Sequence, residues 1–259
     1  MNGIVTGLGE LARIADDAAR LAHAIPQFTD GMALTVDDAY AVQALSLARR
    51  AARGERRVGM KMGLTSRAKM AQVGVDEMIW GRLTDAMQVE EGGTIRRSAY
   101  VHPRVEPELA FLLKAPLAGR VTAAQALAAV EAVAPALEII DSRYRDFKFA
   151  LPDVIADNSS SSGFVVGQWR RPDLDVGNLG LALLADGQPV QVGSTAAILG
   201  HPVRSLVAAA RLVAQWGERL EAGWIVLAGG ATAAHPLAPG MAVRADMQGL
   251  GSVSFQVGE

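Results

Sequence analysis

The sequence contains no cysteine, so disulfide bonds, thiolate metal ligands and cysteine nucleophiles are all excluded. It also lacks a dense block of lysine and arginine, and its formal net charge of -2 does not match a surface that binds nucleic acid. The first 25 residues lack the basic start and apolar block of a signal peptide, and no apolar run approaches membrane-spanning length. We therefore expect a cytoplasmic protein that contacts neither nucleic acid nor a membrane.

Familiar catalytic motifs are absent as well. There is no Gly-x-Ser-x-Gly nucleophile elbow and no His-Glu-x-x-His zinc helix. The segment around Lys61 lacks the Gly-Lys-Ser/Thr order of a phosphate loop, and Gly229-Gly230 does not begin a dinucleotide-binding pattern. Any chemistry must therefore come from another arrangement of side chains.

What the chain does have is enough apolar sequence for a large core, since half of its 259 residues are hydrophobic. Apolar residues at helical spacing predict helices over 9–24 and 35–53, the second opened by Thr35 with Asp38 in a capping box. We expect residues 1–56 to form a small N-terminal helical layer on a β-rich catalytic domain, 57–259, the two making one cooperative unit.

Beyond residue 56, short apolar runs alternate with turn residues, without the regular strand-helix alternation of a Rossmann or barrel fold. Helices are expected over 66–72, 122–133 and 202–216, and a loop over 74–83 with Ile79 and Trp80 buried. The fold class is therefore α+β, with a mixed β-rich core and flanking helices. The expected strands cover 57–64, 104–113, 136–140, 164–166, 179–184, 189–192, 224–227, 241–247 and 252–257.

Two acidic stretches dominate the central part of the chain. Glu106 and Glu108 are two residues apart in an apolar run, so a strand places both on one face, where like charges repel. One of them is protonated, or the face is open to water, or a cation lies between them. Glu138 and Asp141 in a second apolar run favour the cation, and oxygen ligands suit Mg²⁺ or Mn²⁺. A solvated edge strand is the alternative, because Pro107 fits an edge or a bulge.

Lys61 lies in a run in which Val58, Met60, Met62 and Leu64 alternate with small residues. This pattern predicts a strand whose second face carries little except Lys61, which can therefore approach a bound anion. The alternative is an edge-strand lysine that discourages aggregation. A metal, a lysine and the polar Ser/Asn loop at 156–163 suit a substrate with adjacent carboxylate and carbonyl oxygens, whose enolate the metal would stabilise.

Five segments resemble the hydratase/decarboxylase branch of the fumarylacetoacetate hydrolase superfamily, and the resemblance runs along nearly the whole chain. They are Lys61-Met-Gly-Leu-Thr-Ser, Trp80-Gly-Arg-Leu, Arg104-Val-Glu-Pro-Glu-Leu-Ala-Phe, Ala136-Leu-Glu-Ile-Ile-Asp-Ser-Arg and Ala156-Asp-Asn-Ser-Ser.

The resemblance implies a mixed β-sandwich roll, Mg²⁺ or Mn²⁺ held by Glu106, Glu108 and Glu138, and a catalytic Lys61. The implied reaction is decarboxylation of 2-oxohex-3-enedioate to 2-hydroxypenta-2,4-dienoate and CO₂ through a chelated dienolate, in the meta-cleavage of catechols. The implied partners are further copies of the chain, the hydratase that consumes this product, or both.

Other residues are assigned supporting roles. Leu64, Ser160, Ser161 and Thr232 are the expected substrate contacts. Asp141 faces away from Glu138 on a strand, so we expect it to support the site as a partner of Arg143 or Arg145.

Two other functions stay open. The hydratases of this branch are expected to carry Asp immediately before the aromatic-Gly pair, where this chain has Ile79, although Asp76 and Glu77 lie nearby. A non-catalytic scaffold subunit is the second alternative. It is disfavoured because burying this many carboxylates without a catalytic role would cost several kcal/mol.

Overall fold

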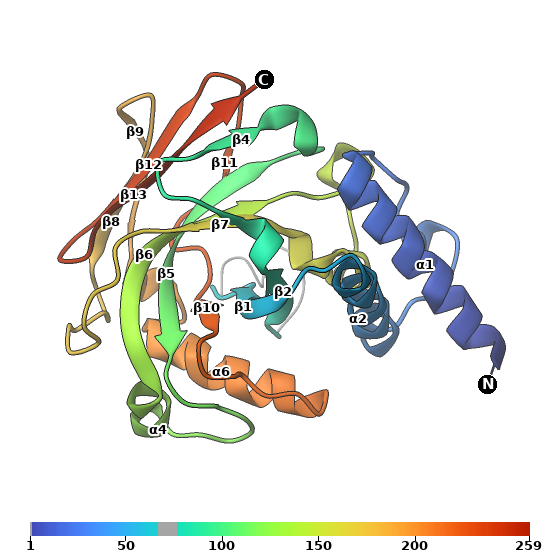
Figure 1. The fold of residues 1–259 in the computed structure, drawn as a ribbon, viewed down its shortest axis with the longest axis horizontal. Helices are drawn as coiled ribbons and strands as arrows, with labels where there is room; N and C mark the ends of the chain where they lie inside the picture. Colours follow the sequence, from blue (N-terminus) through green and yellow to red (C-terminus); the bar gives the residue numbers. More distant parts are fainter. Residues whose placement is uncertain (1, 67–76) are drawn as a thin grey trace.

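The computed structural model describes residues 2–66 and 77–259, and within them the strands form two sheets (Figure 1). The larger sheet has the order β2-β1-β10-β5-β6-β7-β3, with β11 pairing to β5. Its strands are β1 (Arg57–Gly63), β2 (Ile79–Thr84), β3 (Gln88–Val89), β5 (Arg104–Leu113), β6 (Val130–Ile140), β7 (Ser161–Val166), β10 (Ile225–Leu227) and β11 (His235–Pro236).

The smaller sheet has the order β4-β13-β12-β8-β9. Its strands are β4 (Thr94–Arg96), β8 (Gly180–Ala185), β9 (Gln188–Ser194), β12 (Ala242–Met247) and β13 (Gly251–Gly258). The helices in the described residues are α1 (Asn2–Leu21), α2 (Val36–Ala52), α4 (Ala123–Ala128), α5 (Leu151–Ala156) and α6 (Pro202–Gln215).

Alternation along β5 and β6 gives the larger sheet two different faces. Val105, Leu137 and Ile139 point outward and pack on Val243 and Phe255 of the smaller sheet. Further along β5 the same outward face packs among the residues of α6. The inward face of the larger sheet carries a separate small apolar cluster, which includes Ala110, Ala136, Phe164 and Leu227. This two-sheet roll confirms the α+β fold class, and its inner face is where β5 and β6 place their acidic residues.

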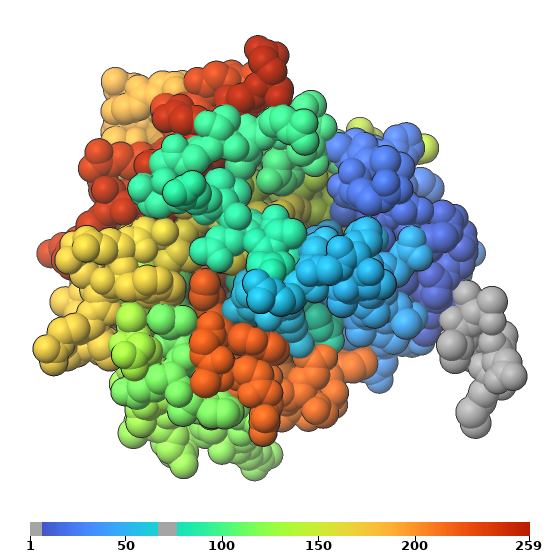
Figure 2. All heavy atoms as spheres, viewed as in Figure 1, coloured from blue at the N-terminus to red at the C-terminus, as the bar shows by residue number. Residues whose placement is uncertain are grey.

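The N-terminal helices lie on the flank away from the smaller sheet, as the blue residues show in the space-filling view (Figure 2). The capping box at the start of α2 is confirmed, since Thr35 Oγ1 accepts a hydrogen bond from Asp38 N at 3.1 Å and the Asp38 carboxylate accepts one from Thr35 N. The division between residues 56 and 57 stays a prediction.

Two predicted elements were wrong. The helix expected over 122–133 ends at Ala128, and β6 already begins at Val130, so Pro135 lies inside a strand. The strand tolerates Pro135 because a proline has no backbone N–H to donate. The Pro135 carbonyl accepts a hydrogen bond from Gly167 N, just beyond the last residue of β7. The nitrogen of Pro135 therefore faces the same side, where the pairing of β6 with β7 has ended. The loop expected over 74–83 is β2 from Ile79 onward, although Ile79 and Trp80 are buried as predicted.

The helix expected over 66–72 lies almost entirely outside the described residues. The prediction that no run approaches membrane-spanning length needs a correction, because Thr195–Gln215 passes that test by length and composition. Its continuous helix, α6, has 14 residues and spans about 21 Å, which is shorter than the roughly 30 Å hydrocarbon core of a bilayer. Most of its side chains pack into the protein core.

Candidate active site

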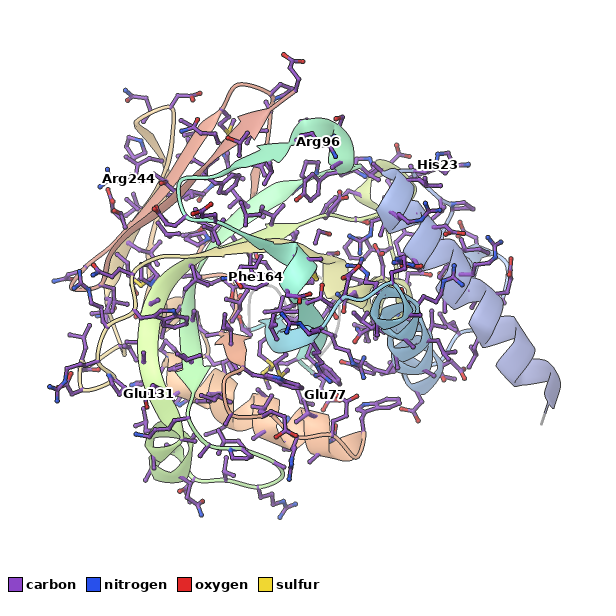
Figure 3. All side chains as sticks on the ribbon, viewed as in Figure 1. His23, Glu77, Arg96, Glu131, Phe164 and Arg244 are labelled. Atoms are coloured by element: carbon purple, nitrogen blue, oxygen red, sulfur yellow. The ribbon has the colours of Figure 1, made fainter. Side chains whose placement is uncertain are left out.

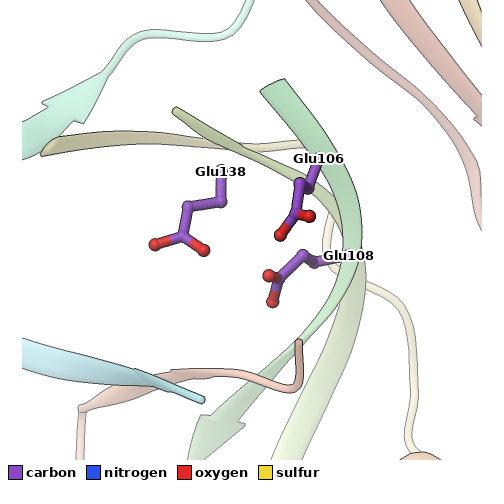
Figure 4. A group of neighbouring side chains, drawn as sticks. All are labelled: Glu106, Glu108 and Glu138. Carbon is purple, nitrogen blue, oxygen red and sulfur yellow. The ribbon is translucent and has the colours of Figure 1, made fainter. Parts of the chain in front are cut away.

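Three carboxylates converge on the inner face of the larger sheet. Glu106 and Glu108 project from β5, and Glu138 projects from β6, where it pairs in register with Glu106. One carboxylate oxygen from each residue lies within 4.8 Å of the other two, and the three side chains point into one shared space (Figure 4). Glu108 and Glu138 are completely buried and Glu106 is 8% exposed. The predicted acidic cluster is therefore present, and β5 has neighbours on both sides, so the edge-strand alternative was wrong.

Two members of the cluster, Glu108 and Glu138, have carboxylate oxygens without a hydrogen-bond partner among the described residues. Glu108 Oε2 accepts a hydrogen bond from Gly229 N at 2.6 Å, but Glu108 Oε1 and Glu138 Oε1 are buried without a partner among the described residues. Burial, with the neighbouring Glu138 carboxylate adding to it, raises the pKa of Glu108 well above its ordinary value. Burial also raises the pKa of Glu138. Unpaired carboxylate oxygens in such proximity are the donor set of a hard divalent cation, so these residues fit Mg²⁺ or Mn²⁺.

Gly229 is required by this arrangement. Its φ of 111° is in a region that other residues rarely adopt, and an added Cβ would lie 2.0 Å from Thr65 Oγ1. Only glycine therefore lets the backbone N–H approach Glu108. Sequence reasoning considered Gly229-Gly230 only as a dinucleotide motif and missed this role.

Lys61 reaches the cluster from β1. Its Nζ forms an ion pair with Glu138 Oε2 at 2.9 Å and donates a hydrogen bond to the carbonyl of Ser159 at 3.2 Å. Burial opposes the charged form, but the carboxylates of Glu138, Glu108 and Glu106 outweigh it and raise the pKa of Lys61. Lys61 is 4% exposed and β1 lies between β2 and β10, so the edge-lysine alternative was wrong.

The carbonyl that Lys61 contacts belongs to an unusual turn. Asn158, Ser159 and Ser160 all have φ between 52° and 60°, a left-handed conformation that costs about 1 kcal/mol or more for each non-glycine residue. Such a turn persists only when its surroundings hold it in place. The ordered turn expected in the Ser/Asn loop is therefore present.

Strand β2 holds this turn. Asn158 Oδ1 accepts from Arg82 N at 2.8 Å, and Asn158 Nδ2 donates to Arg82 O at 2.9 Å. Ser159 Oγ donates to Trp80 O at 2.7 Å. Between these contacts lies Gly81, where a Cβ would be 2.4 Å from Asn158 O. The pair Asn158 and Gly81 thus aligns the turn with β2 and directs the Ser159 carbonyl toward Lys61.

A pocket of about 320 Å³ opens beside the cluster. Among the described residues, its charged lining consists of Lys61, Glu106 and Arg104, and most of the remaining described wall is apolar. Of the four expected substrate contacts, Leu64 and Ser160 line the pocket, whereas Ser161 and Thr232 do not belong to its lining. The other lining residues in the described part of the chain are Gly63, Ile79, Ile140, Phe147, Phe149, Val154, Ser159, Ala233 and Ala234.

Asp141 and Arg143 lie next to the site, but they do not form the ion pair with each other that the sequence suggested. Asp141 accepts hydrogen bonds from the backbone N–H groups of Val101 and His102. The Arg143 guanidinium forms a buried ion pair with Asp157, immediately before the left-handed turn. Arg143 also donates to the Asp157 carbonyl, so it supports the turn at its first residues.

Comparisons with known proteins point to one family. A model of the fumarylacetoacetate (FAA) hydrolase C-terminal family matches residues 53–258. A 4-oxalocrotonate decarboxylase from Pseudomonas sp. is 61% identical over 248 residues, 96% of this chain and 97% of that protein. A 2-hydroxyhexa-2,4-dienoate hydratase from Comamonas testosteroni is 35% identical over 94% of each chain. In the solved structures, 4-oxalocrotonate decarboxylase from Pseudomonas putida G7, complexed with magnesium and adipate, matches with a TM-score of 0.94, 41% identity and 97% coverage of both chains.

Proposed function

This chain belongs to the fumarylacetoacetate hydrolase family, and from that premise we propose that it is a metal-dependent carboxy-lyase. Its substrate is 2-oxohex-3-enedioate, also called 4-oxalocrotonate, and its products are 2-hydroxypenta-2,4-dienoate and CO₂. The observation that carries the proposal is the buried cluster of Glu106, Glu108 and Glu138, which opens on a pocket with Lys61. The 61% identity to a 4-oxalocrotonate decarboxylase supports the choice of reaction, and the structural match that contains magnesium and adipate supports a cation and a six-carbon dicarboxylate.

Decarboxylation requires an acceptor for the electron pair of the carbon–carbon bond that breaks. The C5–C6 bond breaks and C6 leaves as CO₂, while its electron pair forms a C4–C5 double bond. The former C3–C4 double bond becomes C2–C3, and the carbonyl pair moves to the C2 oxygen, which takes up one proton. A bound Mg²⁺ or Mn²⁺ supplies Lewis-acid stabilisation of negative charge on the 1-carboxylate and 2-oxo oxygens.

The residues around the pocket have separate roles in binding the ion and the substrate. Glu106, Glu108 and Glu138 would hold the ion through their carboxylate oxygens, which include the buried Oε1 atoms of Glu108 and Glu138. Lys61 has three N–H donors, of which one faces Glu138 and one faces the Ser159 carbonyl, so a third remains for an oxygen of the substrate. We assign Lys61 the role of stabilising and protonating the developing anion. The apolar pocket wall excludes water and strengthens these charge interactions.

The test is turnover of purified protein with 2-oxohex-3-enedioate, followed by CO₂ release with and without Mg²⁺. We expect activity with the metal and its loss on addition of a chelator. Glu106→Gln should abolish turnover without unfolding the protein, whereas Glu131→Gln, an exposed change on the outer part of β6, should not (Figure 3). Turnover that persists in chelator would overturn the metal assignment.

The hydratase alternative is less well supported by the pocket. Ile79 lines it at the position where the hydratases of the resemblance are expected to carry Asp, so no water-activating carboxylate is supplied there. The Glu77 side chain is 62% exposed and lies within 3.6 Å of Arg211, away from the pocket lining, and Asp76 lies outside the described residues. Loss of the ultraviolet absorbance of 2-hydroxypenta-2,4-dienoate, added as substrate, would establish hydration instead. If neither compound is consumed, a scaffold role gains support.

We also propose that the protein acts in the cytoplasm as a homo-oligomer, in complex with the pathway hydratase, or both. The hydratase relatives support the pathway link, because the product of the decarboxylation is the substrate of a hydration. Light scattering of the purified chain, alone and mixed with such a hydratase, would measure both associations.

A further inference from the structure

Arg104 is a cation in the pocket with no polar partner in the described structure. It begins β5 and lies two residues before Glu106, so both side chains point to the inner face of the sheet. Within residues 2–66 and 77–259, no carboxylate lies within ion-pair distance of its guanidinium and no group accepts a hydrogen bond from it. The N–H donors of the guanidinium are therefore not used by the described protein groups, and Arg104 lines the pocket where a ligand would bind.

An aromatic ring holds this guanidinium in place. Its central carbon lies 4.3 Å from the ring centroid of Phe147, which in turn contacts the rings of Phe149 and His102. Phe147 and the preceding Asp146 both have left-handed φ values, 57° and 59°. Two such residues in succession are costly, so the surrounding contacts must fix Phe147 where it stacks on Arg104.

The spacing of the pocket charges matches a substrate with two carboxylates. Residues two apart on a strand are separated by roughly 7 Å, which is close to the length of an extended six-carbon diacid. Apolar side chains line the pocket beside Arg104 and Glu106 and suit the carbon chain. We propose that Arg104 binds the distal carboxylate of the substrate, the one that leaves as CO₂, while the other end lies at the carboxylate cluster.

This inference rests on the proposed function for the identity of the substrate, and it has a distinctive kinetic consequence. The distal carboxylate is charged in the bound substrate, but during the reaction its charge moves toward the C2 oxygen. Arg104 therefore attracts the ground state more strongly than the transition state. Loss of Arg104 should raise KM strongly while kcat changes little or increases.

A matched pair of unreactive ligands tests the assignment directly. 2-Oxohexanedioate and 2-oxohexanoate share the chelating end and differ only in the distal carboxylate. Calorimetric titration of the Mg²⁺-loaded protein should show about 10- to 100-fold tighter binding of the dicarboxylate, the range expected for one charge-assisted contact. Arg104→Gln should remove this preference and leave binding of 2-oxohexanoate unchanged. Arg104→Lys should retain part of it, because the charge remains without the planar fork.

Two further variants make the outcome decisive. Arg96→Gln removes an exposed arginine on β4 of the smaller sheet and should not change the preference (Figure 3). Phe147→Leu leaves Arg104 in the chain but removes the ring that holds it, so it should reduce the preference even if Arg104→Gln fails to fold. An unchanged preference in both Arg104→Gln and Phe147→Leu would overturn the assignment.

The two proposals fail in different ways. If the native protein decarboxylates 2-oxohex-3-enedioate but Arg104→Gln keeps the native KM, the proposed function stands and the Arg104 assignment is wrong. If the native protein does not decarboxylate it but the dicarboxylate preference depends on Arg104, the carboxylate subsite stands and the proposed function is wrong.

Discussion

Replacing Glu108 with glutamine should stabilise the protein when no metal is bound. Among the described residues, the metal-free cluster brings three glutamates and one lysine, Lys61, together in a buried space. Two unit charges 4.8 Å apart repel by about 3.5 kcal/mol at an effective dielectric constant of 20. Burial and the neighbouring Glu138 carboxylate raise the pKa of Glu108, because the charged form of Glu108 is unfavourable in this space.

Lys61 offsets part of this repulsion, so Glu108→Gln should raise the free energy of unfolding of the metal-free protein by about 2 to 3 kcal/mol. For a chain of this length, the midpoint of thermal unfolding should rise by roughly 5 to 10 °C. Glutamine keeps an oxygen that accepts from Gly229 N, and its amide donates to a carboxylate oxygen of Glu138 that has no partner. The substitution therefore removes charge without removing the existing hydrogen bond.

The pH dependence follows from the direction of the shift. Because the pKa of Glu108 is raised in the folded state, its favourable contribution is complete below about pH 4.5 and is lost as pH rises through the folded-state pKa. The gain from Glu108→Gln should thus be small near pH 4.5 and grow toward neutral pH. Differential scanning calorimetry in chelator, repeated at several pH values, measures it.

Magnesium should reverse the order of stability. Ligand at 1,000 times its dissociation constant adds about 4.1 kcal/mol to the native protein, which exceeds the gain of about 2 to 3 kcal/mol from the substitution, whereas Glu108→Gln should gain much less from the metal. Glu131→Gln, an exposed change on β6, serves as the control and should behave like the native protein in both conditions. A lower unfolding midpoint for metal-free Glu108→Gln at pH 7 would refute the reasoning, since Glu108 would then be stabilising as a charged partner of Lys61.

Two other substitutions test the catalytic side of the site. Lys61→Met should lower kcat by about 10²- to 10⁴-fold, while calorimetry should show that Mg²⁺ binding is retained. Lys61→Arg tests whether a positive charge at this position is sufficient for catalysis. Loss of Mg²⁺ binding in Lys61→Met would instead make Lys61 part of the cation site. Asn158→Ala should lower the free energy of unfolding by about 2 to 3 kcal/mol, measured in urea, through two lost hydrogen bonds and a left-handed alanine. Asn158→Gly relieves only the backbone strain, so it should recover about 1 kcal/mol of that loss, and equal stability of the two variants would remove strain from the explanation.

Local patterns predicted those parts of the site that depend on local geometry. Period-2 alternation placed Glu106 and Glu108 on one face, and it also assigned Lys61 to a strand, because side-chain direction along a strand depends only on position. The same rule places Arg104 on the face of Glu106, so this residue was available to sequence reasoning and was overlooked. The resemblance supplied the role of Glu138, and the register of β6 against β5 agrees with it.

Other features depend on chain segments that meet only in the fold. The Gly229 N–H reaches Glu108 across 121 residues, and no pattern around either residue indicates that contact. Pro135 suggested the end of a helix, yet it lies in a central strand because β7 stops pairing beside it. Arg143 pairs with Asp157 and not with Asp141, whose carboxylate accepts hydrogen bonds from the backbone of Val101 and His102. Each of these depends on tertiary contacts that override local preference.

The dispersed origin of the carboxylate cluster also limits when it can form during folding. Its residues come from β1, β5 and β6, and its glycine donor follows β10, so the larger sheet must be nearly complete before all of these groups meet. Contacts between distant segments require loop closure and form slowly. Divalent ions should therefore slow unfolding without accelerating refolding, because a partly assembled sheet has no site to offer them. The metal should therefore stabilise the larger sheet after the sheet has formed, without directing its formation.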